Sequence, residues 1–250
     1  MSRIFTFLIC IFTLFSIFSN AYAKVNKERI YKTIRAYWKS DLVERELKRK
    51  KTEPSKYAYR IIDEVVNITN KKGNSWLSAE KFLGMATVES NLLWWEVGGG
   101  YKGNWDCGIT QIAVKWLEKS YKKRWALCQK LVNSTKLAFE YAMKKLNKIK
   151  KSYCGWRYKQ TDYRFDQCIF NIYNQGHRFL WNKWRYCSFK KKPGESSKHF
   201  NRRIWRCKLR NRYWLRVRCF SHMYSSGKIP RKNCRKATSL QWISWQFRKK

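Results

Sequence analysis

The sequence predicts a mainly α-helical protein with a small β or irregular insertion, held together by disulfide bonds. Apolar residues recur at helical spacing through most of residues 55–174, and a glycine-rich stretch at residues 91–108 interrupts them. Eight cysteines follow residue 23, and an even number in an exported chain indicates disulfides. Hydrophobic residues make up 44% of the chain, which is enough to form a core and excludes wholesale disorder.

The N-terminus has the layout of a secretory signal peptide. Arg3 supplies a positive charge, residues 4–18 form an apolar run, and Ala21-Tyr22-Ala23 offers a small-residue cleavage site. An uncleaved membrane anchor is the alternative interpretation. We therefore expect residues 1–23 to be removed on export, and the mature chain to be periplasmic or extracellular.

Residues 24–54 are polar and strongly charged, with helical patches at residues 30–38 and 42–47. Pro54 and Ser55 interrupt that pattern. We interpret this segment as an N-terminal extension outside the core.

The next two helices are better marked. Apolar residues at helical spacing predict an amphipathic helix over residues 55–68. Ser78 is a suitable N-cap for a second helix, in which Phe82, Met85 and Glu89 share one face. Glu89 is therefore expected at the C-terminal end of an apolar stripe rather than on a solvated face.

The remainder of the chain is expected to be helical after the insertion. Residues 91–108 predict turns or a short hairpin, and helical periodicity returns at residues 112–121, 131–149 and 163–174. Residues 185–250 contain 21 Lys or Arg, one acidic residue and four cysteines. We interpret residues 55–184 as the central domain and residues 185–250 as a basic, cysteine-rich C-terminal extension.

The charge balance points to polyanionic partners. The chain has 56 Lys and Arg against 16 Asp and Glu, a formal net charge of +40. For an exported chain the accessible polyanions are anionic wall polymers, lipopolysaccharide and anionic lipid. Nucleic acid would be the default partner of a cytosolic chain, but no recognised nucleic-acid motif is present. Since there is no C-x-x-C pair, disulfides are favoured over zinc, and we predict neither a metal nor a cofactor.

Three short segments carry the chemistry. They are residues 86–91 (ATVESN), 103–112 (GNWDCGITQI) and 172–176 (IYNQG). Breaking a glycosidic bond requires a carboxylic acid that still holds its proton near neutral pH, and burial at an apolar helix end raises a carboxyl pKa in this way. Glu89 is placed for that role.

The three segments resemble, in order, the motifs of the lytic transglycosylases of the SLT type within the lysozyme-like superfamily. The resemblance covers roughly residues 57–182, and Thr110 departs from the apolar residue usual at its position. It implies a lysozyme-like α+β domain that cleaves the β-1,4 bond between MurNAc and GlcNAc in peptidoglycan. Glu89 would be the catalytic acid, and the substrate-binding residues would be Ser90, Gln111, Tyr173 and Asn174, with Trp105 as a further cleft candidate.

Asp106 connects the chain to a second family. The stretch Asp106 to Ile112 also resembles the Asp-x-Gly-Ile-x-Gln-Ile stretch of c-type lysozymes, in which this aspartate is the second catalytic carboxylate. A similar string occurs in transglycosylases that accompany secretion machines, so a secretion apparatus is a candidate partner. Cys107 beside Asp106 is unusual for these families, and a disulfide from it to Cys168, near the third motif, would pin the walls of the cleft.

Two mechanisms therefore stay open, and we favour the first. A lytic transglycosylase would use Glu89 alone and leave 1,6-anhydro-muramic ends. A lysozyme-type hydrolase would use Glu89 and Asp106 together. A non-enzymatic alternative is a cationic protein that binds envelopes or glycans through charge.

Overall fold

The computed structural model describes residues 25–40, 42–100, 103–175 and 193–228, with the backbone alone at residues 40, 175 and 200–212. The predicted signal segment 1–23 and Gly176 of the third motif lie outside this part. The described chain is mainly helical, as the sequence predicts, with a small three-stranded sheet. The α-helices are α2 (Lys27–Ser40), α3 (Val43–Arg49), α4 (Pro54–Thr69), α5 (Ala79–Ser90), α6 (Tyr121–Asn133), α7 (Thr135–Ile149), α8 (Tyr163–Gln175) and α10 (Ser197–Ser226).

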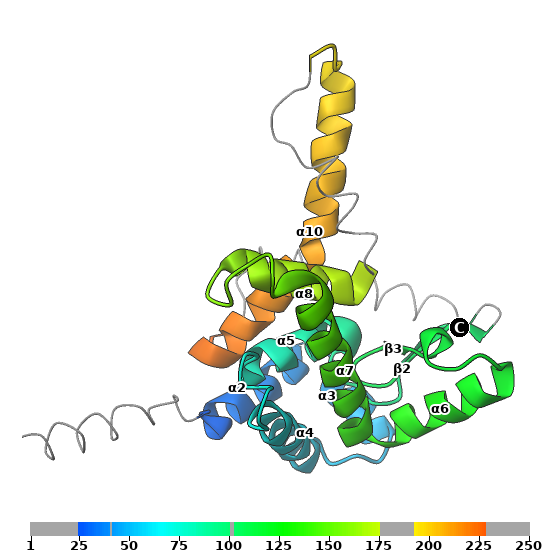
Figure 1. The fold of residues 1–250 in the computed structure, drawn as a ribbon. Helices are drawn as coiled ribbons and strands as arrows, with labels where there is room; N and C mark the ends of the chain where they lie inside the picture. Colours follow the sequence, from blue (N-terminus) through cyan, green and yellow to red (C-terminus); the bar gives the residue numbers. More distant parts are fainter. Residues whose placement is uncertain (1–24, 41, 101–102, 176–192, 229–250) are drawn as a thin grey trace, which may run out of the picture.

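The central helices α4 and α5 begin where the sequence predicts. Pro54 occupies the first turn of α4, where its missing N–H costs nothing, and the Glu53 carboxylate accepts hydrogen bonds from the first free backbone N–H groups. The Ser78 hydroxyl accepts a hydrogen bond from Lys81 N at 3.3 Å and so caps α5. Helix α5 packs against both α4 and α10, which places it in the middle of the fold (Figure 1).

The insertion is an antiparallel sheet of β1 (Val97–Gly99), β2 (Trp105–Cys107) and β3 (Ile112–Ala113), with β2 in the centre. Asp106 is paired on both sides, with Gly98 and Ala113. The helix predicted over residues 112–121 is wrong. Gln111 has a φ of 48°, which turns the chain into β3, and a single 3-10 turn, η2 (Val114–Trp116), follows.

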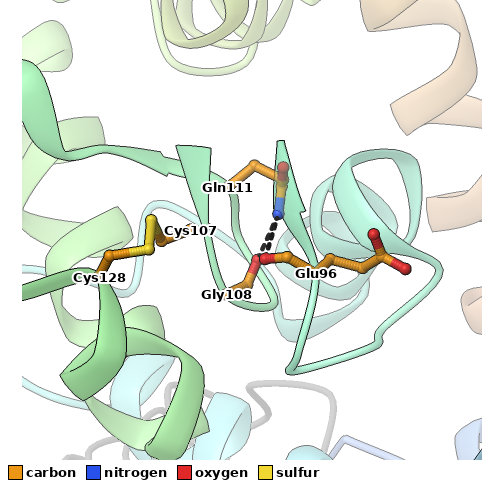
Figure 2. Close-up of a disulfide and its surroundings, with 5 residues drawn as sticks. All are labelled: Glu96, Cys107, Gly108, Gln111 and Cys128. Carbon is orange, nitrogen blue, oxygen red and sulfur yellow. Dashed lines mark hydrogen bonds between the residues drawn. A yellow bond between two sulfur atoms is a disulfide. The ribbon is translucent and has the colours of Figure 1, made fainter. Parts of the chain in front are cut away.

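Two disulfides have both cysteines within the described residues, one from the insertion and one between the π-helical turn η3 (Lys150–Cys154) and α8. Cys107 in β2 is bonded to Cys128 in α6 (Figure 2), and Cys154 to Cys168, which links η3 to α8. The suggested Cys107–Cys168 pair is therefore wrong, because each cysteine finds its partner in a nearer stretch of chain. Closing the loop between Cys107 and Cys128 stabilises the fold by about 3 kcal/mol through the entropy of the unfolded chain.

Helices α2 and α3 belong to the hydrophobic core. Ile30, Ile34, Trp38 and Leu47 are all fully buried in the same cluster as the residues of α4 and α5. The sequence interpretation of residues 24–54 placed them outside the core, and the structure differs for α2 and α3. Charged residues separate the apolar residues of these two helices, so the composition of the segment did not indicate that each helix has a buried face.

Helix α10 is joined just as closely to the domain. Its C-terminal part lies across α5, α8 and α2, whereas its N-terminal part extends beyond the other helices (Figure 1). A Cβ built at Gly84 of α5 would lie 2.8 Å from both Ser221 N and Val217 O, so the two helix backbones are in direct contact. The segment from Tyr213 to Tyr224 is thus part of the fold rather than an appended extension. No helix in the described ranges has both the length and the apolar character needed to cross a bilayer.

Candidate functional site

Glu89 lies in the last turn of α5 and is partly buried. The helix ends one residue later, because Asn91 adopts a left-handed conformation with φ of 55°. Two side chains of α2 hold this turn. Tyr37 donates its hydroxyl hydrogen to Asn91 Oδ1 at 2.9 Å, and Trp38 Nε1 donates to Asn91 O at 3.3 Å. Helix α2 therefore positions the end of the helix that carries Glu89.

The carboxyl of Glu89 has a partner from α10. The Tyr213 hydroxyl donates a hydrogen bond to Glu89 Oε1. Burial raises the pKa of Glu89 to about 7, an effect that outweighs the opposing influence of the Tyr213 hydrogen bond. Burial also raises the pKa of Tyr213 well above its usual range, so this hydroxyl stays a donor. Glu89 can consequently exist as a neutral acid near neutral pH.

Three further charged groups act on Glu89 from other elements, namely Asp106, Lys145 and Arg216 of α10. Asp106 of β2 is partly buried, and burial raises its pKa while the charges of Lys145 and Lys115 oppose the rise. Burial lowers the pKa of Lys145 in α7, and the charges of Glu89 and Asp106 oppose that fall. The pKa of Glu89 is lowered by Lys145 and raised by Asp106 in turn. The site thus combines two carboxyl groups with the partly buried amine of Lys145 and the charge of Arg216.

Ser90 joins the first motif to the second. Its buried hydroxyl lies 2.7 Å from Ile109 O, to which it donates, and 3.3 Å from Ala86 O. These contacts are to backbone atoms, so Ser90 positions the end of α5 against the turn that follows β2. This agrees with a supporting role beside Glu89 more closely than with direct substrate contact.

Gln111 holds the same turn from inside. Its Nε2 donates to Gly108 O at 2.9 Å and to Glu96 O at 3.0 Å, and the side chain is buried (Figure 2). Gly108 itself has a φ of 73°, and a Cβ there would meet Leu131 O at 2.7 Å, so glycine is required. The amide nitrogen of Gln111 therefore braces the sheet, whereas the sequence predicted that this residue lines a glycan cleft.

Tyr173 joins the third motif to the second. Its hydroxyl donates to Thr110 O at 2.8 Å, and its backbone carbonyl accepts a hydrogen bond from Lys145 Nζ at 2.8 Å. The same ammonium group lies 3.9 Å from the centroid of the Tyr173 ring, within cation–π range. Asn174, the next residue of α8, is exposed. The structure thus brings residues of all three motifs together, with Lys145 among them.

Trp105 is placed differently from the sequence prediction. Its side chain is only 8% exposed, and its ring packs against Tyr121 and Trp125 at centroid distances of 4.8 and 4.9 Å. The cleft role proposed for Trp105 is therefore not favoured, because these aromatic neighbours cover it. The exposed faces of this cluster belong to the two residues of α6.

Sequence reasoning missed three residues around Glu89, namely Tyr213, Arg216 and Lys145. A signal for α10 was present, because Tyr213, Val217, Phe220 and Tyr224 recur at helical spacing and all four are buried. The excess of basic residues in this region obscured it. Lys145 carried no such signal, since lysine at a helical position is usually solvated.

The side chains of the site are organic acids, amides, phenols and amines. In the described part of the chain, no three His, Cys, Asp or Glu side chains are grouped as a metal site would require. No protein-family model, curated protein or solved structure matches the chain. The chemistry of the site therefore has to be argued from its own residues.

Replacing Lys145 by methionine is expected to raise the pKa of Glu89 further, on the order of 1 unit, because a nearby opposite charge is lost while burial remains. Carbon-13 NMR titration of the Glu89 carboxyl would measure the shift. Lys145→Arg keeps the charge and should titrate close to the parent. Lys144→Met, at the exposed neighbouring position, is the matched control. An equal shift in the Lys144 variant would contradict the assignment of this effect to Lys145.

Proposed function

We propose that this protein cleaves the glycan strands of peptidoglycan at the β-1,4 bond between MurNAc and GlcNAc, with Glu89 as the general acid. The observation that carries the proposal is the burial of the Glu89 carboxyl at the end of α5, beneath Tyr213, which raises its pKa to about 7. An acid with this pKa is protonated in a large fraction of molecules at neutral pH and can protonate the leaving oxygen. The resemblance of the three motifs to lytic transglycosylases supplies the substrate class.

The favoured mechanism is that of a lytic transglycosylase. Glu89 protonates the glycosidic oxygen, and the resulting carboxylate then accepts the proton of the muramic acid C6 hydroxyl as that oxygen closes onto C1. The product carries a 1,6-anhydro-muramic end. Tyr213 supports the first proton transfer, because its hydroxyl hydrogen bond, together with the charges of Lys145 and Arg216, favours the ionised form of Glu89 that this step leaves.

A hydrolase is the second candidate, and Asp106 is the observation that favours it. The charge of Asp106 acts on Glu89, and the charges of Lys145 and Lys115 favour the ionised form of Asp106. An ionised Asp106 could stabilise or trap the oxocarbenium ion before water attacks. Because both roles use the same acid, only the products separate them.

The expected setting is the cell envelope. Export through the predicted signal peptide would place the mature chain in the envelope. The net charge of +40 favours partners that are negatively charged, such as anionic wall polymers or lipopolysaccharide. Cleavage beside a secretion apparatus is one setting in which local opening of the wall would be useful. No cofactor is needed for either mechanism.

Product analysis tests the proposal. Purified peptidoglycan is digested with the mature protein or with its Glu89→Gln variant, and the soluble products are analysed by mass spectrometry. We expect 1,6-anhydro-muramic products from the parent and none from the variant. Products one water heavier, with free reducing ends, would establish the hydrolase and move Asp106 to the centre of the mechanism. If the parent releases no products, or the variant releases as much, the proposed enzymatic function is wrong, and a cationic binding protein becomes the better description.

A further inference from the structure

Four of the exposed large apolar side chains in the described part of the chain lie in one short stretch at the edge of the fold. Trp116 is 79% exposed, Tyr121 62%, and Leu117 and Trp125 45% each. Trp116 closes η2, Leu117 follows it, and the other two lie in the first turns of α6. Helix α6 contacts η2, so these side chains belong to one local unit at the periphery of the molecule (Figure 1).

The support beneath these side chains is rigid. Tyr121 and Trp125 lie one helical turn apart and pack on the buried ring of Trp105. Arg124 Nε donates to Glu118 O at 2.7 Å, which ties the start of α6 to the end of η2. The disulfide between Cys107 and Cys128 fastens α6 to β2. These contacts fix the start of α6, so the exposed side chains are held on the surface of the protein.

Cations lie beside the apolar groups in the sequence. Lys115, Lys119, Lys122, Lys123 and Arg124 lie in the same stretch, against a single acid, Glu118. Lys115 Nζ is 5.0 Å from the centroid of the Trp116 ring. Lys119, Lys122 and Lys123 are exposed. We call the set Trp116, Leu117, Tyr121 and Trp125, with these five cations, the α6 patch.

We propose that the α6 patch binds the surface of an anionic lipid bilayer. Tryptophan and tyrosine favour the interface between headgroups and acyl chains, and lysine and arginine are attracted by anionic headgroups. Leu117 favours a bilayer over a glycan strand as the partner, because an aliphatic side chain is stabilised by contact with acyl chains but has no flat face to stack on a sugar. A protein partner would fit the apolar groups, but the solvated cations beside them are depleted at the cores of protein interfaces.

The proposal goes beyond peptidoglycan cleavage, because it gives the site a location. Strand β2 carries Asp106, and the Cys107–Cys128 disulfide joins that strand to α6. A bilayer bound at the α6 patch would therefore hold the candidate site at a constant distance from the membrane surface. Glycan strands close to the membrane would then be the accessible ones.

Vesicle sedimentation tests the proposal with the exported form, beginning at Lys24. Vesicles of phosphatidylethanolamine and phosphatidylglycerol are compared with vesicles of phosphatidylcholine alone. We expect Trp116→Ala combined with Leu117→Ala to weaken binding to the anionic vesicles at least about tenfold, because both side chains leave the interface. Trp156→Ala is the matched control, since Trp156 is 67% exposed and lies outside the patch. It should bind as the parent does.

Two double variants, each replacing a pair of lysines, distinguish vesicle binding at the α6 patch from attraction by the overall positive charge of the protein. Lys122→Gln combined with Lys123→Gln should weaken binding, and Lys71→Gln combined with Lys72→Gln, at exposed positions elsewhere, should do so much less. Equal losses in the two pairs, or equal losses in the two tryptophan variants, would overturn the proposal. A loss of binding to purified peptidoglycan, with vesicle binding retained, would also overturn it and assign the patch to the glycan. Cleavage of soluble glycan fragments should be unchanged in the patch variants, which keeps this test separate from that of the enzymatic function.

Discussion

Replacing Glu89 by glutamine is expected to lower peptidoglycan cleavage by about 10²- to 10⁴-fold, which is the usual contribution of a general acid. The amide keeps the shape of the side chain and still offers an oxygen to the Tyr213 hydroxyl, but it has no proton to give to a leaving oxygen. In the parent, the rate should fall as pH rises through about 7, because Glu89 loses its proton there. The variant should lack that dependence.

Glu89→Gln is also expected to raise the free energy of unfolding at alkaline pH, whereas most mutations of core residues lower it. The pKa of Glu89 in the folded state is about 7, above the ordinary value of 4.5. The stability that follows from this raised pKa is fully present below pH 4.5 and is lost as pH rises through 7, since the buried carboxylate must then carry its charge. The loss amounts to about 3 kcal/mol at most. The Glu89→Gln variant escapes it and should be the more stable protein at pH 8.

Denaturant unfolding of both proteins between pH 4.5 and 8 would measure this difference, together with the pH profile of kcat/KM. Glu80→Gln, the same change in the first turn of α5, is the control and should leave the pH profile of kcat/KM unchanged. A Glu89→Gln variant whose stability follows that of the parent at every pH would show that Glu89 has an ordinary pKa. The basis of the proposed function would then be lost.

Substituting Gly84 by valine is expected to separate α10 from α5 and to destabilise the fold on the order of 3 kcal/mol through overpacking. The added Cβ would lie 2.8 Å from two backbone atoms of α10, which cannot rotate away as a side chain could. The displacement would withdraw Tyr213 from Glu89 and admit water. Because burial is the largest cause of the raised pKa of Glu89, the basic limb of activity should move to lower pH.

Thermal unfolding and the pH profile of kcat/KM would test this second prediction. Gly84→Ala is a milder step that keeps the protein folded, and any loss it causes occurs despite the gain of about 1 kcal/mol that alanine brings to a helix. Leu215→Ala, at an exposed position of α10, should change neither quantity. Unaltered stability in both glycine variants would mean that the two helices do not pack closely in solution.

Both the helix that carries Glu89 and the position of the insertion after it can be predicted from local sequence pattern. The spacing of Phe82, Met85 and Glu89, together with Ser78 as N-cap, predicted a helix with Glu89 at the end of its apolar stripe, and the structure confirms that helix. The glycines between residues 91 and 108 predicted the break that became the sheet. These features depend on residues within one or two turns of each other, so backbone geometry and periodicity are sufficient to find them.

The surroundings of Glu89 were decided by the tertiary structure. Tyr213 is 124 positions from Glu89 in the sequence, and its hydroxyl reaches the carboxyl only because Gly84 lets α10 approach α5. Lys145 enters the site because α7 packs beside α8, where the Tyr173 carbonyl binds the ammonium group. The sequence predicted that Gln111 and Trp105 bind the substrate. In the folded protein the Gln111 side chain hydrogen-bonds to backbone carbonyls beside the sheet, and Trp105 packs against α6. The sequence alone singled out Glu89 as the candidate acid, whereas burial, the cause of its raised pKa, arises from elements far apart in the chain.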